Sequence, residues 1–295
     1  MNNEQTIGGY EAGLFQTHRP DTWWLEPFLT GLGFLSFVIY TTWAMFQGDY
    51  YWWSAGSEGF GGYLSPFYSP LLFIEERAAG SAPLLHAWFG PWPEWMPNLI
   101  PVTPAILILA GPLSFRLTCY YYRKFYYRSY FLSPPACAVA GVHQKDYKGE
   151  TALLVIQNIH RFTLYIAIGF VAVLSYDAFL SFFRDGKFGV GVGSIILLLN
   201  PIFLAGYTFG CHAFRHLSGG RHDCFTCPQG KEKVSFKIWQ GVSWLNGRHM
   251  FWAWISMIWV ALGDIYVRLV AKGYWTDFSN WGNSNGLFRY SDYRT

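Results

Sequence analysis

Five runs of mostly apolar residues constrain this chain more than any other feature of its sequence. Each run has roughly the 20 residues that a helix needs to cross the hydrocarbon core of a bilayer. The runs extend from about Pro27 to Phe46, Leu99 to Tyr120, Ile159 to Phe182, Phe188 to Phe209 and Met250 to Val270. We therefore predict an all-α integral membrane protein, built as a bundle of about five transmembrane helices.

The composition agrees with a membrane protein. Hydrophobic residues make up 52% of the 295 residues and charged residues 13%, against roughly 25% charged residues in soluble domains. Aromatic residues reach 21%, and amphipathic Trp and Tyr side chains are typical of membrane–water interfaces. The net charge of +3 is too small to indicate nucleic acid, so we expect the lipid membrane and no nucleic acid as a partner.

The distribution of basic residues predicts the orientation, because loops rich in Lys and Arg stay in the cytoplasm. The two basic loops follow the second and fourth runs and contain Arg123, Lys124, Arg128, Lys145 and Lys148, and Arg215, Arg221, Lys231, Lys233, Lys237 and Arg248. We therefore place the N-terminus inside. The predicted parts are a cytoplasmic segment (1–26), a five-span domain (27–270) with a metal loop (211–228) on the cytoplasmic face, and an external tail (271–295).

One apolar segment is too short to span. The residues from Tyr63 to Ile74 are interrupted by prolines, and we expect this segment to be re-entrant or interfacial.

Three cysteines and three histidines fall within 17 residues, directly after the fourth run. They are Cys211, His212, His216, His222, Cys224 and Cys227. If the fourth helix continues to His216, His212 and His216 share one face and Cys211 points roughly 100° away. Cys224 and Cys227 form a C-x-x-C motif, whose spacing lets two thiolates bind one metal ion.

Two kinds of metal site fit these residue types. A single Zn²⁺ would take two imidazoles and two thiolates as a closed structural site. A Rieske-type [2Fe–2S] cluster takes two Cys on one iron and two His on the other. The spacing alone does not separate these readings, and a third reading is that the residues only pack a loop. A disulfide between Cys224 and Cys227 is disfavoured in a reducing cytoplasm.

The stretch from Gly210 to Cys227 resembles the membrane-anchor subunit of a mycobacterial-type succinate dehydrogenase. The aromatic-basic run from Tyr120 to Arg128 and the Ser133–Cys137 segment are also similar to that family. The resemblance implies a Rieske-type [2Fe–2S] cluster near the membrane surface. It also implies flavoprotein and iron–sulfur partner subunits, a quinone substrate that is expected to be menaquinone, and a bacterial cytoplasmic (inner) membrane.

Within that resemblance, the preferred metal ligands are His212, His216, Cys224 and Cys227, with Cys211 and His222 in reserve. The chain shows no dinucleotide fingerprint, P-loop or hydrolytic constellation. We therefore expect a subunit that is part of an enzyme and is not catalytic alone. Cys119 and Cys137 are isolated in the sequence and are expected to be inert.

Five further side chains near the cytoplasmic ends of the runs are candidates for quinone binding: His160, Arg161, Trp244, His249 and Arg116. Quinone pockets are mostly apolar with a few polar groups. We do not expect haem, because the first two runs contain no histidine to serve as an axial ligand.

Two carboxylates lie within apolar runs, where charge is costly and therefore informative. Asp264 can pair with Arg268 at i+4, and Asp177 is a candidate for proton movement from the outer face. Two alternative functions stay open. One is a membrane scaffold or transporter subunit with a structural zinc site, and the other is a cytochrome b-like anchor with haem on His160 and His249.

Overall fold

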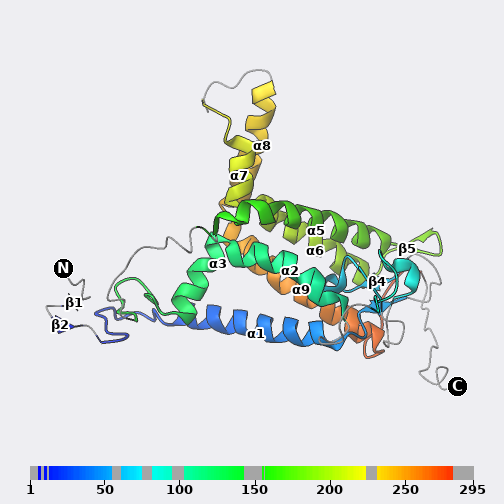
Figure 1. Cartoon of the computed structure of the whole chain (residues 1–295), viewed down its shortest axis with the longest axis horizontal. Coiled ribbons are helices and arrows are strands. Elements are labelled where there is room, and N and C mark those ends of the chain that lie inside the picture. Colours follow the sequence, from blue (N-terminus) through cyan, green and yellow to red (C-terminus); the bar gives the residue numbers. More distant parts are fainter. Residues whose placement is uncertain are drawn as a thin grey trace.

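A computed structural model describes residues 6–7, 10–11, 13–54, 61–74, 82–94, 103–142, 155, 157–223 and 231–281 (Figure 1). Four of its helices are long and apolar enough to cross a membrane. They are α1 (Leu25–Gln47), α5 (His160–Leu180), α6 (Val192–Phe209) and α9 (His249–Ala271). The first, third, fourth and fifth predicted spans are thereby confirmed as long apolar helices, with bounds that differ by a few residues.

The second predicted span is shorter than expected. Its helix α2 (Pro104–Thr118) has 15 residues and begins after Thr103, whose side chain accepts a hydrogen bond from the backbone N–H of Ala105. Cys119 is extended, so the chain breaks there before α3 (Tyr120–Phe125) and the short π-helix η3 (Tyr126–Tyr130). The described residues therefore contain four spanning-length helices and one shorter apolar helix, rather than five equal spans; residues 99–102 lie outside them.

The long helices form one bundle. Helix α6 packs against both α5 and α9, α2 packs against α5, and α1 packs against α9. Gly206 of α6 lies directly against α9, because a Cβ atom at this position would lie 2.5 Å from the ring of Trp252. Glycine at this position lets the two helices approach closely, as small residues do in membrane bundles.

The outer faces of the bundle are apolar. Helix α1 exposes a large number of aliphatic and aromatic side chains, among them Phe28, Leu29, Leu32, Leu35, Val38, Ile39, Trp43 and Phe46. An exposed apolar surface of this extent is unfavourable in water and is expected where a helix faces lipid.

The end of the bundle near β4 in Figure 1 is filled by a non-helical segment. Strands β3 (Trp52–Trp53) and β4 (Tyr63–Leu64) pair in antiparallel fashion, and the 3₁₀-helix η1 (Pro66–Tyr68) follows them. Tyr63, Phe67 and Tyr68 are fully buried. The segment predicted to be re-entrant or interfacial is therefore a plug between helices and does not span.

The remaining short elements lie outside the helical core. They are the strands β1 (Thr6–Ile7), β2 (Tyr10–Glu11), β5 (Phe183–Arg184) and β6 (Lys187–Phe188), and the 3₁₀-helix η2 (Leu84–His86). β1 pairs with β2, and β5 pairs with β6, both in antiparallel fashion.

Two short helices form an arm that projects away from the bundle (Figure 1). They are α7 (His212–Gly219) and α8 (Lys231–Asn246), which pack against each other. Helix α6 ends at Phe209, where the fourth apolar run was predicted to end, and the chain turns at Gly210, so the condition that this helix continues to His216 is not met. The Gly210 carbonyl accepts a hydrogen bond from the Asn246 side chain at 2.8 Å, so a contact from α8 stabilises the break.

Candidate functional site

Two cysteines and two histidines converge at the end of the bundle from which the arm projects. Cys119 follows α2, His160 opens α5, Cys211 lies between α6 and α7, and His249 opens α9. Successive helices run in opposite directions, so the ends of α2 and α6 meet the beginnings of α5 and α9. We call these four residues the Cys/His quartet.

The quartet makes two close contacts between a sulfur and an imidazole nitrogen. The His160 Nε2 atom lies 2.9 Å from the Cys211 Sγ atom. The His249 Nε2 atom lies 3.6 Å from the Cys119 Sγ atom. Both cysteines are buried, with 3% of the surface of Cys119 and 2% of the surface of Cys211 exposed. Two buried thiols and two half-buried imidazoles are thus held together at this end of the bundle.

The orientation of His160 is fixed by Thr118. The Thr118 hydroxyl donates to the Ser114 carbonyl at 2.7 Å and lies 3.0 Å from the His160 Nδ1 atom. Because the hydroxyl proton is used for the carbonyl, we assign the proton of the imidazole to Nδ1, which then donates to Thr118. The Nε2 lone pair is left to face Cys211, as in histidines whose other nitrogen is held by an outer partner.

Aromatic rings enclose both imidazoles. Phe115 stacks on His160 at 4.4 Å between ring centres, and Tyr207 stacks on His249 at 5.0 Å. The Nδ1 atom of His249 is buried and has no hydrogen-bond partner among the described residues. A buried nitrogen without a partner is costly, so this imidazole has unused capacity to bind a further group.

The quartet consists of the donor types that a Rieske-type cluster takes. No three His, Cys, Asp or Glu side chains in the described part of the chain are arranged to hold one ion. A Rieske-type centre instead divides two thiolates and two imidazoles between two irons, and these are the donors present. Burial raises the pKa of Cys211 to about 12, so this group stays a thiol unless a metal ion replaces its proton.

The preferred ligands of the sequence analysis lie in a different place. His212 and His216 are on α7, where both side chains are exposed. His222 lies 3.0 Å from the Ser235 hydroxyl on α8. Cys224 and Cys227 fall outside the described residues, so the predicted ligand set remains a prediction. The reserve ligand Cys211 lies apart from the histidines of the arm, because its side chain faces His160 in the bundle.

The predicted quinone-binding residues divide into two groups. His160 and His249 belong to the quartet, and Arg116 lies in the same region with its guanidinium 4.9 Å from the centre of the Tyr207 ring. Arg161 is exposed and donates to the Asn158 carbonyl. Trp244 is also exposed, and the guanidinium carbon of Arg248 lies 4.3 Å from the centre of its ring. The structure therefore brings three of the five candidates together.

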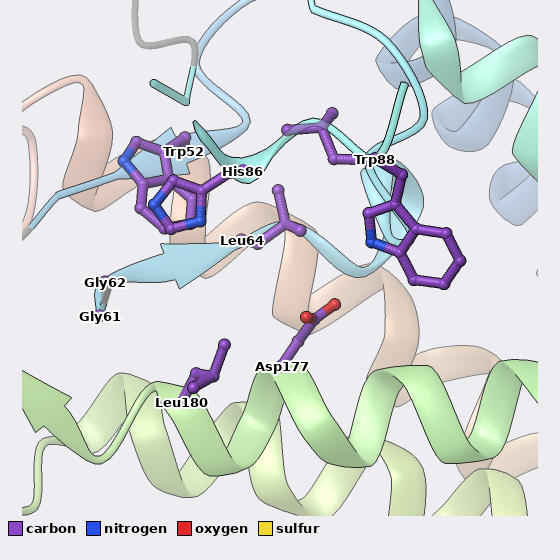
Figure 2. A pocket seen from close by; sticks show the side chains of 9 residues that line it. Trp52, Gly61, Gly62, Leu64, His86, Trp88, Asp177 and Leu180 are labelled. Carbon is purple, nitrogen blue, oxygen red and sulfur yellow. The ribbon is translucent and has the colours of Figure 1, made fainter. Parts of the chain in front are cut away.

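The two carboxylates within the apolar runs have different surroundings. The predicted pair of Asp264 and Arg268 is confirmed, with 2.8 Å between the carboxylate Oδ2 and the guanidinium Nε. Asp177 accepts a hydrogen bond from the Ser69 hydroxyl. It also lines a small pocket with His86 and Trp88 near the plug, far along α5 from the quartet (Figure 2). A role of Asp177 in proton movement stays a prediction.

The quartet is not recognisable from local residue spacing, although the sequence carries a signal for it. Cys119 was expected to be inert, and His160 and His249 were considered only for quinone or haem. In an alternating topology, the end of the second span, the start of the third, the end of the fourth and the start of the fifth all lie at one membrane face. Each of these four positions carries a Cys or a His, a pattern that local spacing does not show.

Comparisons with known proteins agree with this architecture. A family model described as actinobacterial succinate dehydrogenase subunit SdhC matches residues 25–273. A chain in the solved structure of the Mycobacterium smegmatis Sdh1 complex in the apo form is 41% identical, with a TM-score of 0.77 over 92% of this chain and 97% of that chain. No curated protein matches the chain by sequence. The family match covers all four spanning helices and the quartet, and the chain belongs to the actinobacterial succinate dehydrogenase subunit SdhC family.

Proposed function

We propose that this chain transfers electrons from the iron–sulfur subunit of succinate dehydrogenase to a quinone. As a member of its family it is the membrane subunit of that enzyme, which it forms together with the iron–sulfur and flavoprotein subunits. Succinate oxidation takes place in the partners, so this chain is not catalytic alone. Its contribution is to anchor the enzyme and to provide a route between the partners and the quinone, for which menaquinone is our candidate.

The observation that carries the proposal is the convergence of two buried thiols and two imidazoles from four helix ends. We assign Cys119, Cys211, His160 and His249 as the ligands of a Rieske-type [2Fe–2S] cluster. When bound, such a cluster supplies one-electron transfer at a potential set by its ligands and surroundings. The chain's own residues hold the donors rigidly, because each lies at the end of a packed helix.

The loop set of His212, His216, Cys224 and Cys227 is the competing assignment. Two of its members are exposed on the arm, where a closed zinc site would fix the loop between α7 and α8. The quartet is preferred because its two thiols are buried and each is already in contact with an imidazole. Haem is not favoured, since each imidazole Nε2 faces a cysteine sulfur.

The quinone site and the membrane orientation are parts of the same proposal. Arg116 and the Nδ1 atom of His249 supply polar groups among aromatic rings, as quinone pockets require. His160 would contact the quinone only through its ring, because both of its nitrogens have partners. Arg161 and Trp244 would contact only a quinone that enters along the surface. The end with the quartet carries the two basic loops, which favours the cytoplasmic side. In this orientation residues 1–26 are inside, 271–295 are outside, and the quartet faces the docking partners in a bacterial inner membrane.

Electron paramagnetic resonance on the purified complex tests the proposal, with iron, acid-labile sulfide and zinc measured on the same sample. We expect a signal in the reduced state that belongs to none of the partner clusters. Cys119→Ser and Cys211→Ser should abolish it, whereas Cys224→Ser and Cys227→Ser should preserve it. Cys137→Ser is the matched control, because Cys137 is exposed and outside both sets.

Three outcomes contradict the proposal in different ways. Loss of the signal in Cys224→Ser with retention in Cys119→Ser would return the ligands to the loop. One zinc per chain without the signal would make the metal structural. Soret absorption that depends on His160 and His249 would establish a haem anchor.

A further inference from the structure

Three arginine side chains are buried or half-buried within the fold, and the half-buried one, Arg116, lacks a counter-charge among the described residues. Arg184 contacts Asp277 at 3.1 Å, and Arg268 contacts Asp264 at 2.8 Å. Arg116 makes no ion pair within the described part of the chain. Its Nη2 atom donates to the Ser256 hydroxyl at 3.1 Å, and its Nη1 atom donates to the Tyr122 hydroxyl.

The half-buried Arg116 guanidinium loses part of its hydration, and no carboxylate among the described residues offsets that loss. Its partners are hydroxyls, and the Ala253 carbonyl is 3.5 Å from the Nη1 atom. The aromatic rings of Tyr122 and Tyr207 lie 5.6 Å and 4.9 Å from the guanidinium carbon. Dipoles and ring faces stabilise a cation only in part. The unbalanced charge therefore points to an anionic group that binds beside it.

The Tyr207 ring connects this cation to the quartet. The same ring that contacts Arg116 stacks on His249 with an angle of 16° between the planes. Tyr207 also packs edge-on against Phe115, the residue that stacks on His160. Arg116 is therefore one aromatic ring away from the quartet. Its positive charge acts on the quartet in a region of low dielectric, where charges interact strongly.

We propose that Arg116 is the counter-charge of the redox centre and raises its reduction potential. The inference rests on the proposed function, because it assumes that the quartet holds the cluster. Reduction of a centre with these four ligands adds one negative charge at the quartet. A fixed positive charge nearby stabilises the reduced state of the centre relative to its oxidised state. It therefore favours transfer of an electron from the iron–sulfur subunit to the centre.

A redox titration followed by electron paramagnetic resonance tests this role on the intact complex. We expect Arg116→Met to lower the midpoint potential, so that the ratio of reduced to oxidised centre at the wild-type midpoint falls about tenfold, equivalent to ~59 mV for one electron. Arg116→Lys keeps the charge and should recover most of the potential. Arg123→Met is the matched control, because it removes a charge at the same end of the bundle from a side chain that binds Gln157.

The outcomes separate this inference from the proposed function. Absence of the signal in the wild-type complex would refute the cluster itself. A wild-type signal whose potential is unchanged in Arg116→Met would refute the role of Arg116 and leave the cluster standing. A raised KM for quinone at unchanged potential would also refute it, and would leave Arg116 with the role of a quinone contact alone. If Arg116→Met does not assemble, Arg116→Gln carries the same expectation, because it retains an N–H donor for Ser256.

Discussion

At the scale of single residues, the quartet depends on groups that do not belong to it. His160 needs one particular tautomer to present Nε2 to Cys211, and the 3.0 Å contact with the Thr118 hydroxyl selects that tautomer. Phe115 and Tyr207 limit the rotation of the two imidazoles through stacking. These neighbours turn four isolated side chains into a rigid donor set.

Thr118→Val tests the contribution of this outer contact. Valine has the shape of threonine but accepts no hydrogen bond, so the Nδ1–H of His160 loses its partner. A change of this kind weakens metal binding by roughly 10–100-fold. We expect faster loss of iron from the membrane subunit during incubation with a chelator. Ser114→Ala is the control, because Thr118 uses the carbonyl of Ser114 and not its hydroxyl; equal loss from both variants would argue against the tautomer assignment.

At the scale of elements, apolar length predicts the long helices and their approximate ends, but it does not predict the contacts between them. The bounds of α1, α5, α6 and α9 lie within about four residues of the predicted spans because burial in lipid dictates their length. The end of the fourth helix at Phe209 agrees with its predicted span, but the hydrogen bond from Asn246 to the Gly210 carbonyl joins residues 36 positions apart and has no local signal in the sequence. The contact between Cys119 and His249 spans 130 residues, so only the alternation of the spans could have predicted it.

The arm is an element whose packing depends on one glycine. A Cβ atom at Gly219 would lie 2.1 Å from the Trp239 ring, so Gly219→Val must separate α7 from α8. We expect faster cleavage of the arm by trypsin, which recognises its lysines and arginines, in the complex held in detergent. Gly241→Val on α8 meets nothing within 4 Å and should be cleaved like the wild type. Equal cleavage of the two variants would show that the helices do not pack in this way.

At the scale of the whole molecule, buried polar contacts join segments that are far apart in sequence. Arg268 on α9 donates to the Ala44 carbonyl at the end of α1 and to the Asp49 carbonyl after it. Asp264 accepts from the Tyr40 hydroxyl of α1 and from Ser65 in the plug. This ion pair therefore fixes α1, α9 and the plug relative to one another at the end of the bundle opposite the quartet. The stability of that end should depend on both charges being present.

Asp264→Leu removes one of the two charges and leaves the Arg268 guanidinium buried without its partner. Removal of one member of a buried pair costs about 3–5 kcal/mol, so we expect a clearly lower melting temperature of the complex in detergent. The double variant Asp264→Leu with Arg268→Met should recover part of the loss, because two apolar groups leave no unpaired charge. Asp21→Asn breaks the exposed pair of Arg19 and Asp21 and should leave melting unchanged. If the Asp264→Leu and Asp21→Asn complexes have the same melting temperature, the Asp264–Arg268 pair does not fix the bundle. The plug would then have to be held by its buried aromatic side chains alone.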